Sequence, residues 1–338
     1  MKRFTRLWLG AGFLCAITTF APLSYAKDTP LNVVATFSIL GDMVKSVGGD
    51  RVQITTLVGP DSDTHAYHPT PSDAKTILKA DILFVNGWGF EGWLDRLVDA
   101  SGYKGTLITT TQGIDGLPFE HEDEHEDGHK DEHEDKHEDG HKDEHEDKHE
   151  GKHADAHGHH HGDTDPHAWQ SLAHAKTYIQ NITRALLAAD PEGQAVYTQN
   201  RDAYLKQLSD LEVLVTKTLD TLPKERRTVV TSHDAFSYFA DSYQLKFLAP
   251  QGLNPEAEAS ARNVAALIEQ IRAENITALF LENIVSPRLL KQIAAESSVK
   301  VGGTLYADGL SKPDGDAGTY LKMMKHNIIT VYQTLKPE

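Results

Sequence analysis

Three histidines and one aspartate stand where a parallel α/β fold usually places its ligands. His65, His167 and His233 lie in loops at strand exits or helix starts, and Asp308 follows a predicted strand. Three neutral imidazoles and one carboxylate make a four-coordinate N3O set, which suits tetrahedral Zn²⁺. Taken singly, a loop histidine is more often polar surface, and Asp308 before Gly309 is a common turn residue. Four such positions converging on one cleft favour a metal site.

Two further side chains could support that site without binding the metal. His68 lies three residues after His65 in a loop that prolines keep extended, and Glu282 stands at the exit of a predicted strand. Carboxylates commonly orient the imidazoles that bind metals, which is the role considered for Glu282. A buried structural hydrogen bond is the alternative for Glu282, and a surface position or direct ligation are the alternatives for His68.

A second concentration of metal-binding side chains lies in residues 120–163. A histidine recurs at every fourth position there, and the twelve residues His125–Lys136 are repeated identically as His137–Lys148. Histidine-rich tracts of this kind usually bind zinc, copper or nickel. At this spacing neighbouring histidines would share one face of a helix and could chelate one ion. We predict weak metal sites at His121, His125, His129, His133, His137, His141, His145, His149, His153, His157, His159, His160 and His161.

This His-rich segment also carries most of the acidity of the chain. It holds 19 acidic residues and five lysines, a net charge of about −14 out of the −17 of the whole sequence. With almost no apolar side chains it cannot offset the entropy of ordering, so we predict a loop that is disordered or ordered by metal. An acidic solvated linker is the alternative, and an expression tag fits less well because tags lack such a repeat. The negative field attracts cations and repels nucleic acid.

The first 26 residues have the features of a signal peptide. A basic head precedes the apolar stretch Leu7–Phe20, and Ser24-Tyr25-Ala26 fits the small-x-small pattern before a cleavage site. We expect cleavage after Ala26 and a periplasmic mature chain. Cys15 is the only cysteine and follows a leucine, so we expect no lipid anchor, and the mature chain has no thiol. No later apolar run is long enough to span a bilayer.

The rest of the chain alternates between strand and helix patterns, which implies an α/β fold with parallel sheets. The N-terminal pattern predicts a helix capped by Ser72 and another over Glu91–Ala100, and a single long helix is expected from Glu192 to about Leu222. The alternation then resumes to the end of the chain. The predicted division is an N-terminal lobe over 27–190, a linking helix over 191–222 and a C-terminal lobe over 223–338. The natural ligand site is the cleft between the lobes.

Four short motifs resemble those of a known family. They are Asp63-Thr64-His65-Ala66-Tyr67, Asp165-Pro166-His167-Ala168-Trp169, the segment from Thr231 to Phe239 around His233, and the segment from Leu305 to Leu310 around Asp308. In order and spacing they resemble the ligand motifs of the metal-binding solute receptors of bacterial ABC importers. The resemblance implies two (β/α) lobes joined by a rigid long helix, with the metal between them. It also implies that His65, His167, His233 and Asp308 are the ligands.

In this family the third ligand, which is His233 here, determines which metal the site prefers. Its manganese and iron receptors usually have a glutamate where His233 stands, which gives a harder, more oxygen-rich site. The nitrogen donor here favours zinc, and a His-rich loop before the second ligand is typical of the zinc members. Gly309 stands where the family often has a serine.

The leading hypothesis is therefore a monomeric periplasmic receptor, not an enzyme, that captures Zn²⁺ and delivers it to an ABC permease in the inner membrane. A periplasmic zinc-donating protein is a further candidate partner. A manganese or iron receptor of the same family is one alternative, and a periplasmic zinc buffer is another. A zinc hydrolase fits poorly, because a catalytic zinc keeps one position open for water and four protein ligands close the sphere.

Overall fold

The computed structural model describes residues 29–119, 164–252, 255 and 259–337. The predicted signal peptide, residues 1–26, lies outside the described residues, and so does the His-rich segment with its predicted metal sites. Among the helices that are described, none is both long and apolar enough to cross a membrane.

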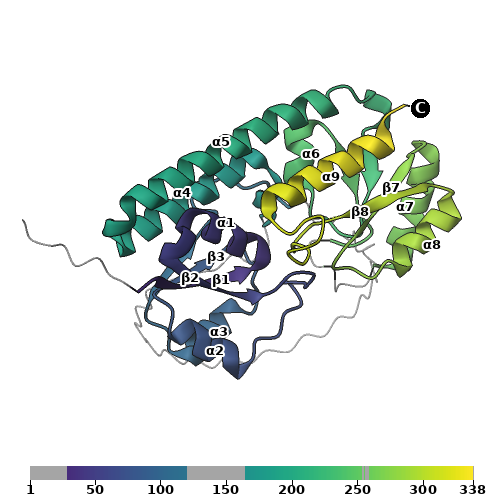
Figure 1. The fold of residues 1–338 in the computed structure, drawn as a ribbon. Coiled ribbons are helices and arrows are strands. Elements are labelled where there is room, and N and C mark those ends of the chain that lie inside the picture. The colour runs from purple at the N-terminus through teal and green to yellow at the C-terminus, as the bar shows by residue number, and fades with distance from the viewer. Residues whose placement is uncertain (1–28, 120–163, 253–254, 256–258, 338) are drawn as a thin grey trace, which may run out of the picture.

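The N-terminal lobe is a four-stranded parallel sheet in the order β2-β1-β3-β4. Its elements are β1 (Leu31–Phe37), α1 (Ser38–Gly48), η1 (Gly49–Arg51), β2 (Val52–Val58), α2 (Pro71–Leu78), β3 (Ile82–Val85), α3 (Leu94–Ser101) and β4 (Thr106–Thr109). The central strand β3 is buried along its whole length, as expected for a parallel strand covered on both faces. Figure 1 shows α2 and α3 on one side of this sheet and α1 on the other.

The C-terminal lobe repeats the same strand order with a second parallel sheet, β6-β5-β7-β8. Its elements are η4 (Lys224–Arg226), β5 (Thr228–Val230), α6 (Ser237–Tyr243), β6 (Lys246–Leu248), α7 (Ala261–Ala273), β7 (Ala278–Glu282), α8 (Arg288–Ser297), β8 (Lys300–Leu305) and α9 (Tyr320–Leu335). The chain is thus an α/β protein of two similar lobes.

One long helix links the lobes, and a shorter helix leads into it. The connecting elements are η2 (Ala168–Gln170), α4 (Leu172–Ala189), η3 (Pro191–Gly193) and α5 (Gln194–Leu219). Helix α5 packs against α4 and α1 at one end and against α9 at the other, and Figure 1 shows it running along both lobes. One hydrophobic cluster accordingly extends from the N-terminal sheet through α5 to α9, and a second lies beneath α7 and α8. The lobes therefore share a core.

Two helix starts differ from the sequence-based prediction. Helix α2 is capped by Thr70 rather than Ser72, through a capping box in which the Thr70 side chain and the Asp73 carboxylate satisfy each other's backbone amides. Helix α3 begins at Leu94 rather than Glu91. The Glu91 carboxylate turns inward and accepts hydrogen bonds from the amides of Asn86 and Gly87, at 2.7 and 3.2 Å. Glu91 therefore closes a turn before α3 and does not form its first residue.

Candidate metal centre

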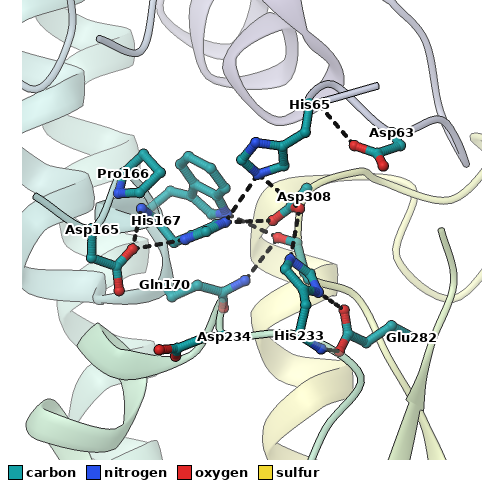
Figure 2. A network of polar contacts seen from close by, with 12 residues as sticks. Asp63, His65, Asp165, Pro166, His167, Gln170, His233, Asp234, Glu282 and Asp308 are labelled. Atoms are coloured by element: carbon teal, nitrogen blue, oxygen red, sulfur yellow. Dashed lines mark hydrogen bonds and ion pairs between the residues drawn. The ribbon is translucent and has the colours of Figure 1, made fainter. Parts of the chain in front are cut away.

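The structure brings the four predicted ligands together between the lobes. One ligand atom from each of His65, His167, His233 and Asp308 lies within 4.8 Å of the other three. The last three residues are fully buried, and the His65 side chain is only 9 % exposed. Figure 2 shows the side chains pointing toward one another from separate segments. Within the described part of the chain, no other group of three or more such side chains could hold an ion.

His65 lies in the loop between β2 and α2, and its neighbours fix it. Asp63 Oδ1 accepts the amide N–H of His65 at 2.8 Å, a local turn typical of aspartate. The Trp93 indole donates to the Thr64 carbonyl at 2.9 Å, and the His65 ring stands edge-on to Phe90 with centroids 4.7 Å apart. The loop therefore presents the imidazole in a defined direction.

His167 immediately precedes η2 and is oriented by an aspartate two residues earlier. Asp165 Oδ1 accepts the backbone amide of His167 at 2.9 Å and lies 2.7 Å from its Nδ1. A carboxylate on Nδ1 leaves Nε2 free to face the centre and makes it a stronger ligand. The same two-residue spacing occurs in Asp63-Thr64-His65, where the aspartate holds only the backbone. Asp165 was not predicted as a site residue, although this repeated spacing was a usable signal.

His233 follows β5 and is held by Glu282 at the end of β7. Glu282 Oε1 accepts the amides of Ser232 and His233 at 2.6 and 3.1 Å, and its Oε2 lies 2.5 Å from His233 Nδ1. Glu282 is buried, and Figure 2 shows it on the side of the ring away from Asp308. The structure thus places the Glu282 carboxylate beside the His233 ring, and its supporting role toward a metal stays a prediction.

Asp308 follows β8 and faces all three imidazoles. Its Oδ2 lies 3.1 Å from His233 Nε2 and 3.7 Å from His65 Nε2, and its Oδ1 lies 3.4 Å from His167 Nε2. The Nε2 atoms of His65 and His167 are 3.4 Å apart. Three Nε2 atoms and a carboxylate this close together fit the donor set of one four-coordinate divalent metal ion.

The charges of the site depend on burial and on these contacts. Burial lowers the pKa of His65 to about 3, so this imidazole is neutral and ready to bind metal. Burial also acts to lower the pKa of His233, but the carboxylates of Glu282 and Asp308 outweigh it and hold that pKa well above its ordinary value. For Asp308, burial acts to raise the pKa, and the neighbouring imidazoles of His167 and His233 outweigh it and hold the pKa below its ordinary range. Metal binding would therefore displace a proton from the cluster.

His68 lies apart from this cluster. Its side chain is exposed and lines a surface groove of about 680 Å³ between α2 and α3. Among the described residues, no hydrogen bond or ion pair joins His68 to the four clustered residues or to their carboxylate partners. The surface alternative for His68 fits this placement.

The sequence and the fold both have known relatives. Residues 33–334 match the family described as ZnuA, zinc-uptake complex component A, periplasmic. The chain belongs to this family. It is 29% identical to the manganese-binding lipoprotein MntA of Halalkalibacterium halodurans, covering 89% of this chain and 87% of that protein. It is 28% identical to the iron-binding protein YfeA of Yersinia pestis, covering 98% of each.

Solved structures with the same fold include periplasmic metal binding proteins in Mn-bound and metal-free forms. The Mn-bound periplasmic metal binding protein from candidatus liberibacter asiaticus, an S38A mutant, superposes with a TM-score of 0.74 at 30% identity, covering 90% of this chain and all (100%) of that chain. The periplasmic zinc binding protein TroA from Treponema pallidum has a TM-score of 0.76 at 24% identity, covering 91% and 100% of the two chains. Family members are solute-binding receptors that work with the permease and ATPase of a metal ABC importer.

Proposed function

We propose that this chain is the zinc-binding receptor of an ABC importer. It captures one Zn²⁺ in the periplasm through His65, His167, His233 and Asp308 and delivers it to a membrane permease. The observation that carries the proposal is the clustering of three Nε2 atoms and one carboxylate in a buried site between the lobes. Such a nitrogen-rich set suits zinc, whereas manganese prefers sites with more oxygen donors.

A manganese or iron receptor is the second candidate, because the relatives named above for those metals match the chain over most of its length. Zn²⁺ binds more tightly than Mn²⁺ at most protein sites, so a preference for zinc alone does not decide between them. The decisive comparison is the ratio of the two dissociation constants in the natural chain and in His233→Glu. A zinc receptor loses part of its selectivity when His233 becomes a hard oxygen donor.

We further propose that the His-rich segment binds additional zinc weakly and collects it for the cleft when zinc is scarce. A periplasmic zinc-donating protein is a second route of supply. The segment is acidic and rich in imidazole, so it raises the local concentration of cations without a preformed site. Its composition predicts a chain that metal binding would have to order, which would make binding there weaker than binding in the cleft.

Deleting the His-rich segment tests both parts of this proposal. Pro118 and Thr164 pair as an antiparallel bridge, so the ends left by removing 120–163 lie side by side and can be joined by a short glycine-serine turn. A receptor keeps one tight zinc site in the deleted chain and captures zinc more slowly at low free zinc. A zinc buffer binds several ions with similar affinity and loses most of them with the segment.

The remaining parts of the proposal concern the mature protein. We propose that it begins at Lys27 after cleavage, acts as a monomer, and is divided at the boundaries predicted above. Mass spectrometry of the secreted chain and light scattering with and without zinc test the first two points. A lipid attached to Cys15, or a stable dimer, would contradict them.

A further inference from the structure

The entry and exit of the His-rich segment form a short two-stranded neck. We use this name for Leu117–Pro118 and Thr164–Asp165. Pro118 and Thr164 form an antiparallel bridge, and the Asp165 amide donates to the Leu117 carbonyl at 2.9 Å. The exit strand of the neck reaches His167 two residues later, so the neck and this predicted ligand are one continuous piece of backbone.

A single tyrosine of the C-terminal lobe holds both strands of the neck. The Tyr238 hydroxyl, on α6, donates to the Asp165 carbonyl at 2.7 Å and accepts the Leu117 amide at 3.0 Å. Tyr238 is 1 % exposed, so these bonds are sheltered from water. Removing the hydroxyl leaves a buried carbonyl and an amide without their partner, which costs more than the bonds themselves contribute.

The next carbonyl along the chain is held from the other lobe. The side-chain amide of Asn86, at the end of β3, donates to the Pro166 carbonyl at 2.9 Å. Asn86 is fixed in turn by the Tyr178 hydroxyl at 2.5 Å and by Glu91, which accepts the Asn86 amide. Two successive carbonyls are thus held by opposite lobes, and the residue between neck and ligand cannot rotate unless one bond breaks.

We propose that Tyr238 is a positioning residue for the metal centre and that its hydroxyl sets how fast the metal leaves. Its bond to the Asp165 carbonyl holds the residue whose carboxylate orients the His167 ring. When the hydroxyl is absent, the segment around Asp165 can turn, and the Nε2 of His167 leaves its direction toward the centre. This inference rests on the proposed function only in requiring that a divalent metal binds these four residues.

Cobalt(II) is a suitable probe, because its visible absorption reports the geometry of the donor atoms around it. We expect Tyr238→Phe to release Co²⁺ to a chelator roughly five- to tenfold faster than the natural chain, the scale of one lost buried hydrogen bond. The visible absorption bands of bound Co²⁺ should also differ between Tyr238→Phe and the natural chain. Tyr243→Phe is the matched control: Tyr243 lies on the same helix, is 6 % exposed, and packs its ring on Phe239 with centroids 4.9 Å apart. It should leave both the spectrum and the release rate unchanged.

Amide exchange gives a second reading that needs no variant. If neck and ligand act as one unit, Co²⁺ binding should slow exchange of the Leu117 amide in the natural chain. Equal release rates and spectra for Tyr238→Phe and Tyr243→Phe would overturn the inference, and so would a Leu117 amide that does not respond to Co²⁺. A natural chain that binds no Co²⁺ would instead refute the proposed metal function.

Discussion

The carboxylate behind His233 offers the sharpest test of how this site is built. Glu282 Oε1 accepts two backbone amides, and Oε2 lies 2.5 Å from His233 Nδ1. In Glu282→Gln, an amide that keeps both backbone bonds must point its NH₂ group at Nδ1. An NH₂ donor favours the tautomer with a bare Nδ1 and a proton on Nε2, the atom meant for the metal. If the side-chain amide at position 282 takes the flipped orientation instead, the backbone N–H groups of Ser232 and His233 lose their acceptor.

Either arrangement weakens metal binding. Loss of a carboxylate that orients a ligating imidazole costs about 10- to 100-fold in metal affinity, or about 1.4–2.8 kcal/mol. A second effect acts in the opposite direction, because Glu282 raises the pKa of His233 and its removal leaves fewer protons to displace. This advantage of Glu282→Gln disappears at higher pH, because His233 of the natural chain is then deprotonated as well. The affinity ratio between the two proteins should therefore widen as pH rises.

Zinc competition with a chromophoric chelator measures the two dissociation constants. Asp190→Asn is the matched control: Asp190 is a second buried carboxylate, but it hydrogen-bonds Arg51 and the Tyr197 hydroxyl instead of an imidazole. We expect that variant to lose stability and to keep most of its zinc affinity. Equal losses of affinity in the two variants, or none in Glu282→Gln, would refute the reasoning about the tautomer.

Three further outcomes are expected. His233→Glu should lower the preference for zinc over manganese by about tenfold or more, which is the size of effect that mutations around a metal site typically have. Unchanged selectivity in a competition between the two metals would mean that His233 is not a ligand. As pH falls below about 6.5, zinc counted per chain should be lost from residues 120–163 before the cleft site, and simultaneous loss would argue against two classes of site. Asp190→Asn should lower the free energy of unfolding by about 1.5–3 kcal/mol at pH 7. Arg51 depresses the pKa of Asp190, so denaturant titrations should show this difference shrinking as pH falls below about 4, and a pH-independent difference would contradict it.

The fold and the four clustered residues were within reach of the sequence because their signals are local. Buried parallel strands appear as apolar runs rich in β-branched residues, and β1 (LNVVATF) and β3 (ILFV) are runs of this kind. Three of the four clustered residues, His65, His233 and Asp308, each follow a strand, and the carboxyl ends of parallel strands meet along one edge of a sheet. His233 and Asp308 follow β5 and β8 of the same sheet, so the sequence alone could place them at one edge of it.

The contacts that Tyr238 and Asn86 make with the segment before His167 were out of reach, because they join residues that the sequence keeps far apart. Tyr238 reaches back 73 positions to Asp165, and Asn86 reaches forward 80 positions to Pro166. Neither residue type is distinctive, and each contact depends on the packing of a whole lobe. The turn that delays α3 is local: Glu91 turns inward to the backbone amides of Asn86 and Gly87, and the φ of Gly87 is +100°.

The neck also bears on how this chain can change over generations. Because its two strands are already bridged at Pro118 and Thr164, the rest of the fold is insulated from the length of what lies between them. Doubling a closed loop costs only about 0.6 kcal/mol. The identical twelve-residue copies, His125–Lys136 and His137–Lys148, have the form of a tandem duplication. Replication slippage can therefore change the number of repeats. Each change adds or removes three histidines and leaves the cleft the same.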